Sequence, residues 1–404
     1  MRLAQGATRC IDAGPGVRRN EDVRTRRNLG IGSPVSSLKA RAVLIDTECG
    51  VLNSLMAGPL SDIFDSRQLI SDQYGAGNNW AQGHMEYGQK YRDSILESVR
   101  HTVELCDSIQ SFFLLHSLGG GTGSGLGTFV LSMLAEEYPD VYRFSTSVFP
   151  SEDDDVVTSP YNSVLALHQL SEFADCVLPV ENQALADICR RVSERAKDKA
   201  SPARVQQTPF DASTHSGAVT AGGAASRSKS FDEMNNIAAH MLTHLTASMR
   251  FQGSLNVDLN EVTMNMVPFP KLKFLMSSIS PLSTQHARGA DGSSFSVDAM
   301  FSEVLHRDNH LIRADPRSST YLACALMARG RVPISDMHRN VERLKKGVKL
   351  IHWNPDGFKI GLCDVAPADQ GQKAALLALS NKLSISCPSP PRHHLIFPSA
   401  LLDS

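Results

Sequence analysis

Short apolar runs alternate with stretches of helical periodicity along residues 41–190. Strands are predicted at 42–45, 112–115, 143–149 and 176–180, and the first two are short apolar runs that end at polar residues. Between the first two of these strands, apolar residues recur mostly every four positions, as on one face of a helix. They are Tyr91, Ile95, Val99, Val103 and Cys106. This order predicts βαβ units and a mostly parallel sheet, with ligands bound at the carboxyl ends of the strands.

The second half of the chain has a different pattern. A long helix is predicted at 231–250, where a stripe at three- and four-residue spacing consists of Met234, Ile237, Ala238, Met241, Leu242 and Leu245. Beyond Pro268, a helix near 334–344 is surrounded by strands predicted at 272–276, 321–327, 350–353 and 360–363. The sequence therefore predicts the α/β class, with a Rossmann-like, mostly parallel nucleotide-binding domain, a long core helix and a smaller α+β domain.

Three segments fall outside this pattern. Between 190 and 230 the composition shifts to Ala, Ser, Gly, Thr and Lys with little periodicity, which predicts a flexible insertion. The first 36 residues are rich in arginine but contain Asp12, Glu21 and Asp22 and no apolar h-region, unlike a transit or signal peptide. The expected organisation is a disordered or misread segment at 1–36, a nucleotide-binding domain at 37–230, a core helix at 231–250, an α+β domain at 251–383 and an irregular tail at 384–404.

The glycine-rich run at 119–125, Gly-Gly-Gly-Thr-Gly-Ser-Gly, follows the predicted strand 112–115. A helix is predicted directly after it and before Pro139, with an apolar face of Leu126, Phe129, Val130, Met133 and Leu134. Backbone N–H groups and the positive end of a helix dipole then converge where no Cβ keeps an anion away, which predicts phosphate binding. The alternative is that the glycines only allow close packing of strand and helix.

This run does not match the two commonest phosphate-binding motifs. A P-loop needs a lysine followed by Ser or Thr after its last glycine, but Leu126 follows Gly125. The dinucleotide fingerprint G-x-G-x-x-G finds no register, because Ser124 and Leu126 stand three residues beyond Gly121 and Gly123. A dinucleotide-dependent oxidoreductase is therefore disfavoured.

Composition narrows the function classes only slightly. A chain of 404 residues with 42% hydrophobic residues can bury a large core. Its formal net charge of −2 argues against a nucleic-acid partner, and no apolar run reaches the length of a membrane span. The eight cysteines show no CxxC pairing, as expected in a reducing cytosol without structural zinc.

The glycine run, with Ser117 before it, matches the signature of the tubulin family, which the chain resembles from about residue 37 to 381. Five segments look most like epsilon-type tubulins: 39–46, 153–162, 174–182, 311–316 and 321–326. The resemblance implies bound GTP and Mg²⁺, longitudinal contacts with other tubulins, and centriolar or basal-body proteins as partners. It also implies a place in the cytoplasm and cytoskeleton, at the centriole, centrosome or basal body.

Two features of the family are missing from this sequence. Tubulins begin with a buried strand and a Gly-Gln-Cys-Gly-type turn that touches the nucleotide, and they end with two long outer helices. Neither is found here. We therefore expect the chain to be incomplete at both ends relative to the family, with one side of the nucleotide site unbuilt and a sheet edge exposed.

The resemblance assigns expected roles to individual residues. The phosphates would be held by Ser117, Gly120, Gly121, Thr122 and Gly123, with Asn78 facing the terminal phosphate. Asp46 and Glu48 would hold a hydrated Mg²⁺, because this cation prefers carboxylate oxygen. The guanine edge would be read by Asn182 and Asn235, with Phe231 where many tubulins stack a tyrosine. Ser159 replaces a glutamate that often meets the ribose. For Asp46 and Glu48 the alternative is a pair of exposed turn carboxylates, and for Asn78 it is a plain glycine turn at residues 75–78.

The segment 256–261 resembles a tubulin loop that docks against the nucleotide of the next subunit. Asp258 and Glu261 match the catalytic, alpha-like version of this loop, in which a carboxylate orients the attacking water. The alternative is a pair of surface acids. Whether the chain hydrolyses GTP on assembly or only binds it is left open, and a tubulin-like scaffold that has lost the nucleotide is the other interpretation.

Overall fold

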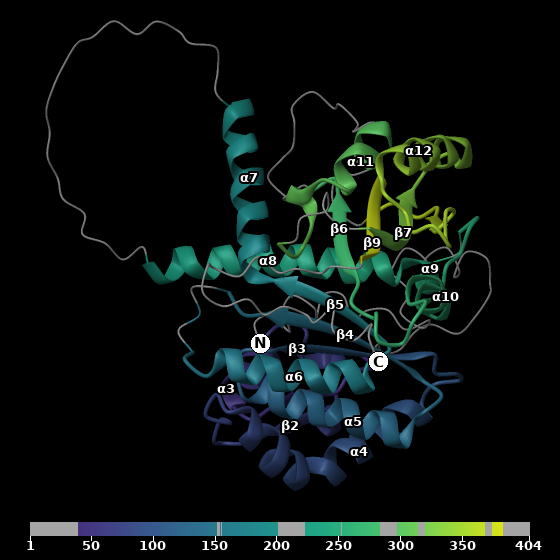
Figure 1. Ribbon diagram of the computed structural model, residues 1–404. Helices are drawn as coiled ribbons and strands as arrows, with labels where there is room; N and C mark the ends of the chain where they lie inside the picture. The colour runs from purple at the N-terminus through teal and green to yellow at the C-terminus, as the bar shows by residue number, and fades with distance from the viewer. Residues whose placement is uncertain are drawn as a thin grey trace, which may run out of the picture.

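The computed structural model describes residues 39–151, 154, 156–200, 223–251, 253–282, 297–313, 320–367 and 374–382 (Figure 1). The strands are β1 (Leu44–Asp46), β2 (Leu69–Ser71), β3 (Ser111–Ser117), β4 (Tyr142–Phe149), β5 (Cys176–Glu181), β6 (Met276–Ser280), β7 (Tyr321–Gly330), β8 (Phe358–Cys363) and β9 (Ala374–Lys382). The α-helices are α3 (Cys49–Met56), α4 (Gly88–Glu104), α5 (Gly127–Glu137), α6 (Ser159–Phe173), α7 (Asn182–Ala200), α8 (Gly223–Leu245), α9 (Ala247–Arg250), α10 (Leu259–Met266), α11 (Val297–Val304) and α12 (Ile334–Gly347). Two π-helical turns, η3 (Gln82–Tyr87) and η4 (Thr122–Leu126), precede α4 and α5, and short 3₁₀ turns are η1 (Ser61–Ile63), η2 (Ser66–Gln68) and η5 (Arg307–Asn309).

The first domain is built on a parallel sheet of order β3-β4-β5. Figure 1 shows α4, α5 and α6 on one face of this sheet and α8 on the other. Side chains of β5 alternate between the two faces: Cys176, Leu178 and Val180 join the core with α7 and α8, whereas Val177 packs with α6. The predicted α/β class with a parallel sheet is therefore confirmed.

The strands β1 and β2 form a separate parallel pair. They are held to the rest of the domain by a hydrophobic core in which Ile70 meets Ile95 of α4 and Phe129 of α5. The described residues contain no ladder between this pair and β3. The first domain thus consists of two parallel sheets joined through helices and side chains.

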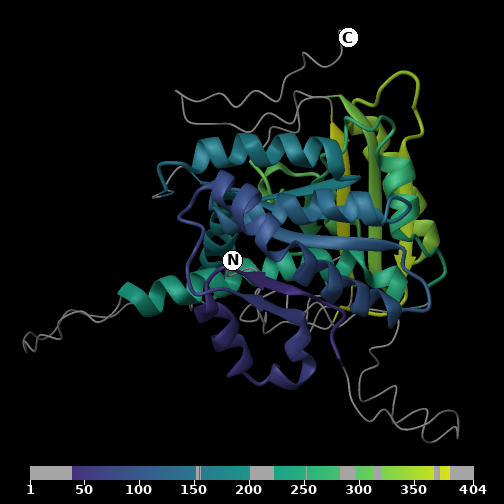
Figure 2. The ribbon, with the colours of Figure 1, turned by 90° about the horizontal axis from the view of Figure 1, so that it is seen from below.

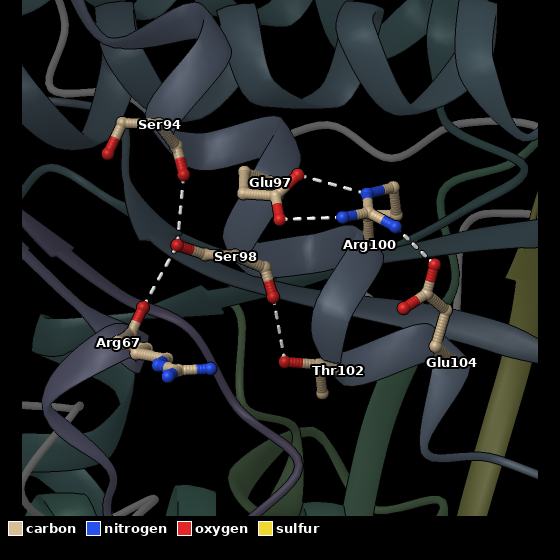
Figure 3. A network of polar contacts seen from close by, with 7 residues as sticks. All are labelled: Arg67, Ser94, Glu97, Ser98, Arg100, Thr102 and Glu104. Carbon is tan, nitrogen blue, oxygen red and sulfur yellow. Dashed lines mark hydrogen bonds and ion pairs between the residues drawn. The ribbon is translucent and has the colours of Figure 1, made fainter.

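The helix α4 is fastened to the turn before β2 by a side-chain contact. The Ser98 hydroxyl lies 2.9 Å from the carbonyl oxygen of Arg67 and 2.9 Å from that of Ser94 (Figure 3). On the exposed side of the same helix, Arg100 pairs with Glu97 and Glu104. Such exposed pairs stabilise a helix only slightly, so α4 is held mainly by its buried face.

The second sheet is mixed and has the order β6-β9-β7-β8. Figure 2 shows its strands running in a clearly different direction from those of the first sheet. Alternate residues of β7 enter two cores: Ala323, Ala325 and Met327 face α8 and the first domain, whereas Cys324 and Leu326 face α11 and α12. The predicted stripe of α8 lies in the first of these cores, so this helix joins the two domains.

Two predicted strands differ from the structure. Residues 350–353 are not a strand, because Leu350 makes only an isolated bridge to Tyr321. The strand expected at 272–276 begins at Met276 instead. Before it, Phe274 pairs with Val177 of β5, because the chain passes here from the first sheet to the second. The expected insertion at 190–230 is helical at both ends, where α7 and α8 extend into it, and residues 201–222 lie outside the described part, as do 1–36 and 384–404.

A set of polar contacts, here called the α7 tie, joins α7 and the last residue of β5 before it, Glu181, to the segment 308–313. The backbone N–H of Arg313 donates to Glu181 Oε2 at 2.9 Å, and its guanidinium pairs with Asp187 Oδ2 at 2.7 Å. Arg191 pairs with Asp308 Oδ2 at 3.0 Å. The start of α7 is therefore fixed to the second domain by both backbone and side-chain contacts.

No helix in the described ranges is long and apolar enough to cross a membrane.

Candidate phosphate-binding site

Three turns meet at the carboxyl ends of the first domain's strands. We call them the acidic turn (residues 46–48, at the end of β1), the Asn78 turn (residues 75–79, after β2) and the glycine loop (residues 119–125, after β3). The Thr47 and Thr122 hydroxyls lie 2.5 Å apart, which joins the acidic turn to the glycine loop. The Asn162 amide donates to the carbonyl oxygens of Asn78, at 2.8 Å, and Gly119, at 2.9 Å. The acidic turn, the Asn78 turn and the glycine loop, which are distant in sequence, are thus held together.

The glycine loop is shaped by contacts that leave no room for side chains. A Cβ on Gly121 would lie 2.7 Å from both Ala76 O and Asn79 N, and one on Gly123 would lie 2.6 Å from Ser117 Oγ. Gly120 is different, because a Cβ there would meet only Asn78 Oδ1, at 3.7 Å. Gly120 therefore faces open space between the glycine loop and the Asn78 turn. The loop continues through η4 into α5, so the start of a helix adjoins this space.

The Asn78 turn has an unusual backbone. Gly77 and Asn78 have φ values of 56° and 53°, a left-handed conformation that glycine and asparagine adopt more readily than other residues. The Asn78 carbonyl oxygen is held at the start of α6. It accepts hydrogen bonds from the Asn162 amide and, at 2.7 Å, from the hydroxyl of Thr158, the residue just before this helix. Sequence reasoning missed these two supporting residues. The available signal was the set of small polar residues, including Asn162 and Ser163, on the buried face of α6.

The acidic turn contains a buried carboxylate that is only half satisfied. Asp46 is 2% exposed, and its Oδ1 accepts a hydrogen bond from the Glu48 N–H at 3.1 Å. Its Oδ2 is buried and has no hydrogen-bond partner among the residues that the structure describes. Burial raises the pKa of Asp46 above its ordinary value. Glu48 is exposed and lies against Gly75, where a Cβ would come within 2.6 Å of Glu48 Oε1.

This acidic turn fits a hydrated divalent cation, because a buried carboxylate oxygen without a partner is a strong ligand for a hard metal ion. The described residues hold no group of three or more His, Cys, Asp or Glu side chains placed for a metal. Two carboxylates from the protein therefore have to be completed by other oxygen ligands. Phosphate oxygens and water are the usual ones for Mg²⁺.

Ser159, the first residue of α6, lies beside the glycine loop. Its hydroxyl donates to Asp154 Oδ2 at 3.1 Å, and both side chains lie close to Gly119. Because Ser159 is only 3% exposed, this residue supports the loop from α6. Asp153 and Asp155 lie outside the described residues.

The residues expected to read a base lie at the junction of α7 and α8. Asn182 is the first residue of α7 and directly follows β5, whereas Phe231 and Asn235 belong to α8, which packs against α7. Asn235 is buried, and Asn182 and Phe231 are partly buried. Because β3, β4 and β5 are parallel, Asn182 lies at the same sheet edge as the glycine loop. The fold thus places Asn182 and the glycine loop along the same edge of the β3-β4-β5 sheet.

Asp258 and Glu261 lie on the second domain, apart from the three turns. They flank the start of α10, which packs on β7 and β9. Asp258 caps this helix, because its Oδ1 accepts a hydrogen bond from the Glu261 N–H at 2.8 Å. Glu261 is 45% exposed and pairs with Lys359 of β8 at 2.6 Å. Asp258 therefore has a structural role as the N-cap of α10.

Comparisons with known proteins agree with these features. A family model described as Tubulin/FtsZ family, GTPase domain, matches residues 30–190, and one described as Tubulin C-terminal domain matches residues 270–387. The chain is 50% identical over 372 residues to a tubulin epsilon chain of Homo sapiens, covering 91% of this chain and 76% of that protein. A tubulin epsilon chain of Mus musculus is 52% identical over 351 residues, covering 87% and 72%. The tubulin alpha-1 chain of Saccharomyces cerevisiae is 36% identical over 355 residues, covering 86% and 72%.

Proposed function

Because this chain belongs to the tubulin family, we propose that it binds GTP and works in the cytoskeleton as an epsilon-type tubulin. The observation that carries the proposal is the glycine loop. Gly121 and Gly123 are closed to side chains while Gly120 faces open space beside the start of α5. Backbone N–H groups and a helix dipole favour a phosphate chain in such a space. The residues proposed to hold it are Ser117, Gly120, Gly121, Thr122, Gly123 and Asn78.

Asp46 and Glu48 are the residues that would hold Mg²⁺ beside the phosphates. The bound cation would supply positive charge against the phosphate oxygens. Support comes from Asp46 Oδ2, which is buried and has no hydrogen-bond partner in the described part of the chain. A cation would relieve this buried negative charge.

We expect Asp46→Asn to stabilise the nucleotide-free protein and to weaken magnesium-dependent binding. The pKa of Asp46 is raised in the folded state, so the folded chain holds this proton more tightly than the unfolded chain. Stability therefore falls as pH rises from the ordinary pKa of 3.8 through the raised pKa of the folded state. Removing the charge should raise the free energy of unfolding by about 1 kcal/mol at pH 7. Urea denaturation without nucleotide would measure this change.

The same variant should lose most of the increase in GTP affinity that Mg²⁺ gives to the wild type. Glu136→Gln, at an exposed end of α5, is a matched control that should change neither quantity. If Asp46→Asn kept the full magnesium effect, the cation would have to be held by other residues.

The base would be guanine, read by Asn182 and Asn235 with Phe231 against the ring. An amide carries a donor and an acceptor together, which suits the guanine edge. Equilibrium binding of labelled GTP in the presence of Mg²⁺, with ATP as competitor, tests this assignment. ATP should compete at least about a hundredfold more weakly, since its base would leave buried polar groups unpaired. Equal competition would refute the guanine assignment.

The alternative is a tubulin-like scaffold that has lost its nucleotide. Ser159 favours it, because this serine stands in place of a glutamate that would meet a ribose, and its hydroxyl is hydrogen-bonded to Asp154. The binding experiment separates the two functions, because a scaffold would show no saturable binding of labelled GTP.

Hydrolysis would be completed between subunits. Asp258 and Glu261 lie on the second domain, so a carboxylate from there would act on the nucleotide of a neighbouring tubulin through a longitudinal contact. Glu261 is proposed to orient the attacking water, and Asp258 to hold the start of α10 and thereby the position of Glu261. The exposed position of Glu261 beside Lys359 makes it accessible to such a neighbour.

We expect Glu261→Gln to leave GTP binding by the isolated chain unchanged but to slow GTP turnover in assembled material about a hundredfold or more, the lower end of the contribution typical of a general base. Glu342→Gln is the control, because Glu342 is also an exposed acid paired with a lysine, Lys345. Phosphate release during assembly would measure the turnover. Equal rates in the two variants would exclude the intersubunit mechanism.

We further propose that the protein acts with centriolar or basal-body proteins, at the centriole, centrosome or basal body. The similarity to the two epsilon chains supports this placement. Fluorescent tagging in a cell with basal bodies would test it, and an even distribution along all cytoplasmic microtubules would contradict it.

A further inference from the structure

His116 lies near the end of β3, just before the glycine loop, and both nitrogens of its ring make hydrogen bonds. Nδ1 lies 2.8 Å from the carbonyl oxygen of Gly123. Nε2 lies 2.9 Å from Ser145 Oγ and 3.2 Å from Ser147 Oγ, and these two hydroxyls lie 2.8 Å apart. None of these three polar residues of β3 and β4 belongs to the set assigned to the nucleotide.

The partners of His116 determine which nitrogen carries the proton. A carbonyl oxygen can only accept, so Nδ1 must carry the hydrogen that it shares with Gly123. Nε2 then accepts a hydrogen bond from one of the two serine hydroxyls. Burial lowers the pKa of His116 to about 4, so the ring is neutral at neutral pH and keeps this single tautomer.

The carbonyl held by His116 controls the direction of a loop N–H group. The Gly123 carbonyl and the Ser124 N–H belong to one planar trans peptide, in which the two groups point in opposite directions. Holding the carbonyl toward β3 therefore directs the Ser124 N–H away from β3. Gly127 permits this arrangement, since a Cβ there would lie 3.3 Å from the His116 ring.

We propose that His116 is a positioning residue, whose Nδ1–H holds the Gly123 carbonyl and thereby fixes the orientation of the Gly123–Ser124 peptide, and with it the backbone of the glycine loop beside the phosphates. Ser145 and Ser147 hold the required tautomer. This inference rests on the proposed binding of GTP. A histidine that served only to fill space in the core would not need these polar partners. In His116, Nδ1 donates to the glycine loop and Nε2 accepts from a serine of β4.

Two substitutions of similar polarity test this role. In His116→Asn the amide nitrogen takes the place of Nδ1 and can still donate to Gly123, whereas in His116→Gln the amide lies further out, near the position of Nε2. We expect the Gln variant to bind GTP about tenfold more weakly than the wild type, as for loss of one well-placed hydrogen bond. The Asn variant should remain within about threefold of the wild type.

Equal GTP affinities of the two variants would overturn the proposal. A second readout is independent of the variants' folding: ¹⁵N NMR of the histidine rings in the wild-type chain should show His116 protonated at Nδ1 and not at Nε2. The opposite tautomer would also overturn it. Failure of the proposed function is distinguishable, because the wild type itself would then not bind GTP.

Discussion

Gly125→Ala is expected to prevent stable folding of the first domain. The new Cβ would lie 2.3 Å from Trp80 O and 2.8 Å from His84 N, both backbone atoms at the start of the π-helical turn η3. Backbone cannot move aside as a flexible side chain can, so η3 and η4 would have to separate. Overpacking of this kind costs about 3 kcal/mol or more. Gly83→Ala should behave similarly, because its Cβ would lie 2.3 Å from Gly121 O.

Controls for this prediction lie in helices elsewhere in the chain. Gly50 in α3 and Gly347 at the end of α12 have nothing within 4 Å of an added Cβ. Alanine at Gly50 should leave stability unchanged or raise it by up to about 1 kcal/mol, because alanine favours the helix. Urea denaturation of all four variants would measure the differences. Similar stability of the Gly125 and Gly50 variants would show that η3 and η4 are not packed as described.

Gly120→Ala should lower the affinity for GTP at least tenfold while leaving stability almost unchanged. The protein itself has room for this Cβ, because the only neighbour is Asn78 Oδ1 at 3.7 Å. That room is the space in which we place the phosphates, so the methyl group would compete with them. A loss of about 1.4 kcal/mol of binding free energy corresponds to the tenfold change.

The experiment combines equilibrium GTP binding with denaturation of the nucleotide-free chain. Gly347→Ala serves as the control, since it adds the same methyl group at the end of α12 in the second domain, where an added Cβ has nothing within 4 Å. Unchanged affinity of Gly120→Ala would place the phosphates elsewhere and would remove the main support for the proposed function. The contrast with Gly125→Ala separates a binding role from a packing role within one loop.

Local patterns predicted the first domain well. Residues 112–115 and the periodicity after the glycine run predicted β3 and α5, because a buried strand and an amphipathic helix each impose a period on the sequence. β9 was not predicted. Its residues are mostly alanine and leucine, which favour helices, and it is a strand because β6 and β7 pair with it on both sides.

The candidate site was only partly predictable. The glycine run itself predicted the phosphate-binding loop, and the resemblance to tubulins pointed to Asp46. Neither the support of Asn78 by Asn162 nor the hydrogen bond of His116 to Gly123 could be predicted. Both contacts join residues that are brought together only by the fold. Asp258 is a different case, because an acid followed three residues later by glutamate is also a helix-start signal, which neither the catalytic interpretation nor the alternative of two surface acids used.

The α7 tie has a consequence for the response of the protein to its surroundings. Asn182 begins the same helix that carries Asp187 and Arg191, so the proposed base-reading corner and the second domain share one rigid element. The side chains of Arg313 and Asp187 are 29% and 25% exposed, so dissolved ions reach this contact. We therefore expect rising ionic strength to loosen the hold of the second domain on that corner and to make the proposed nucleotide affinity sensitive to the electrolyte.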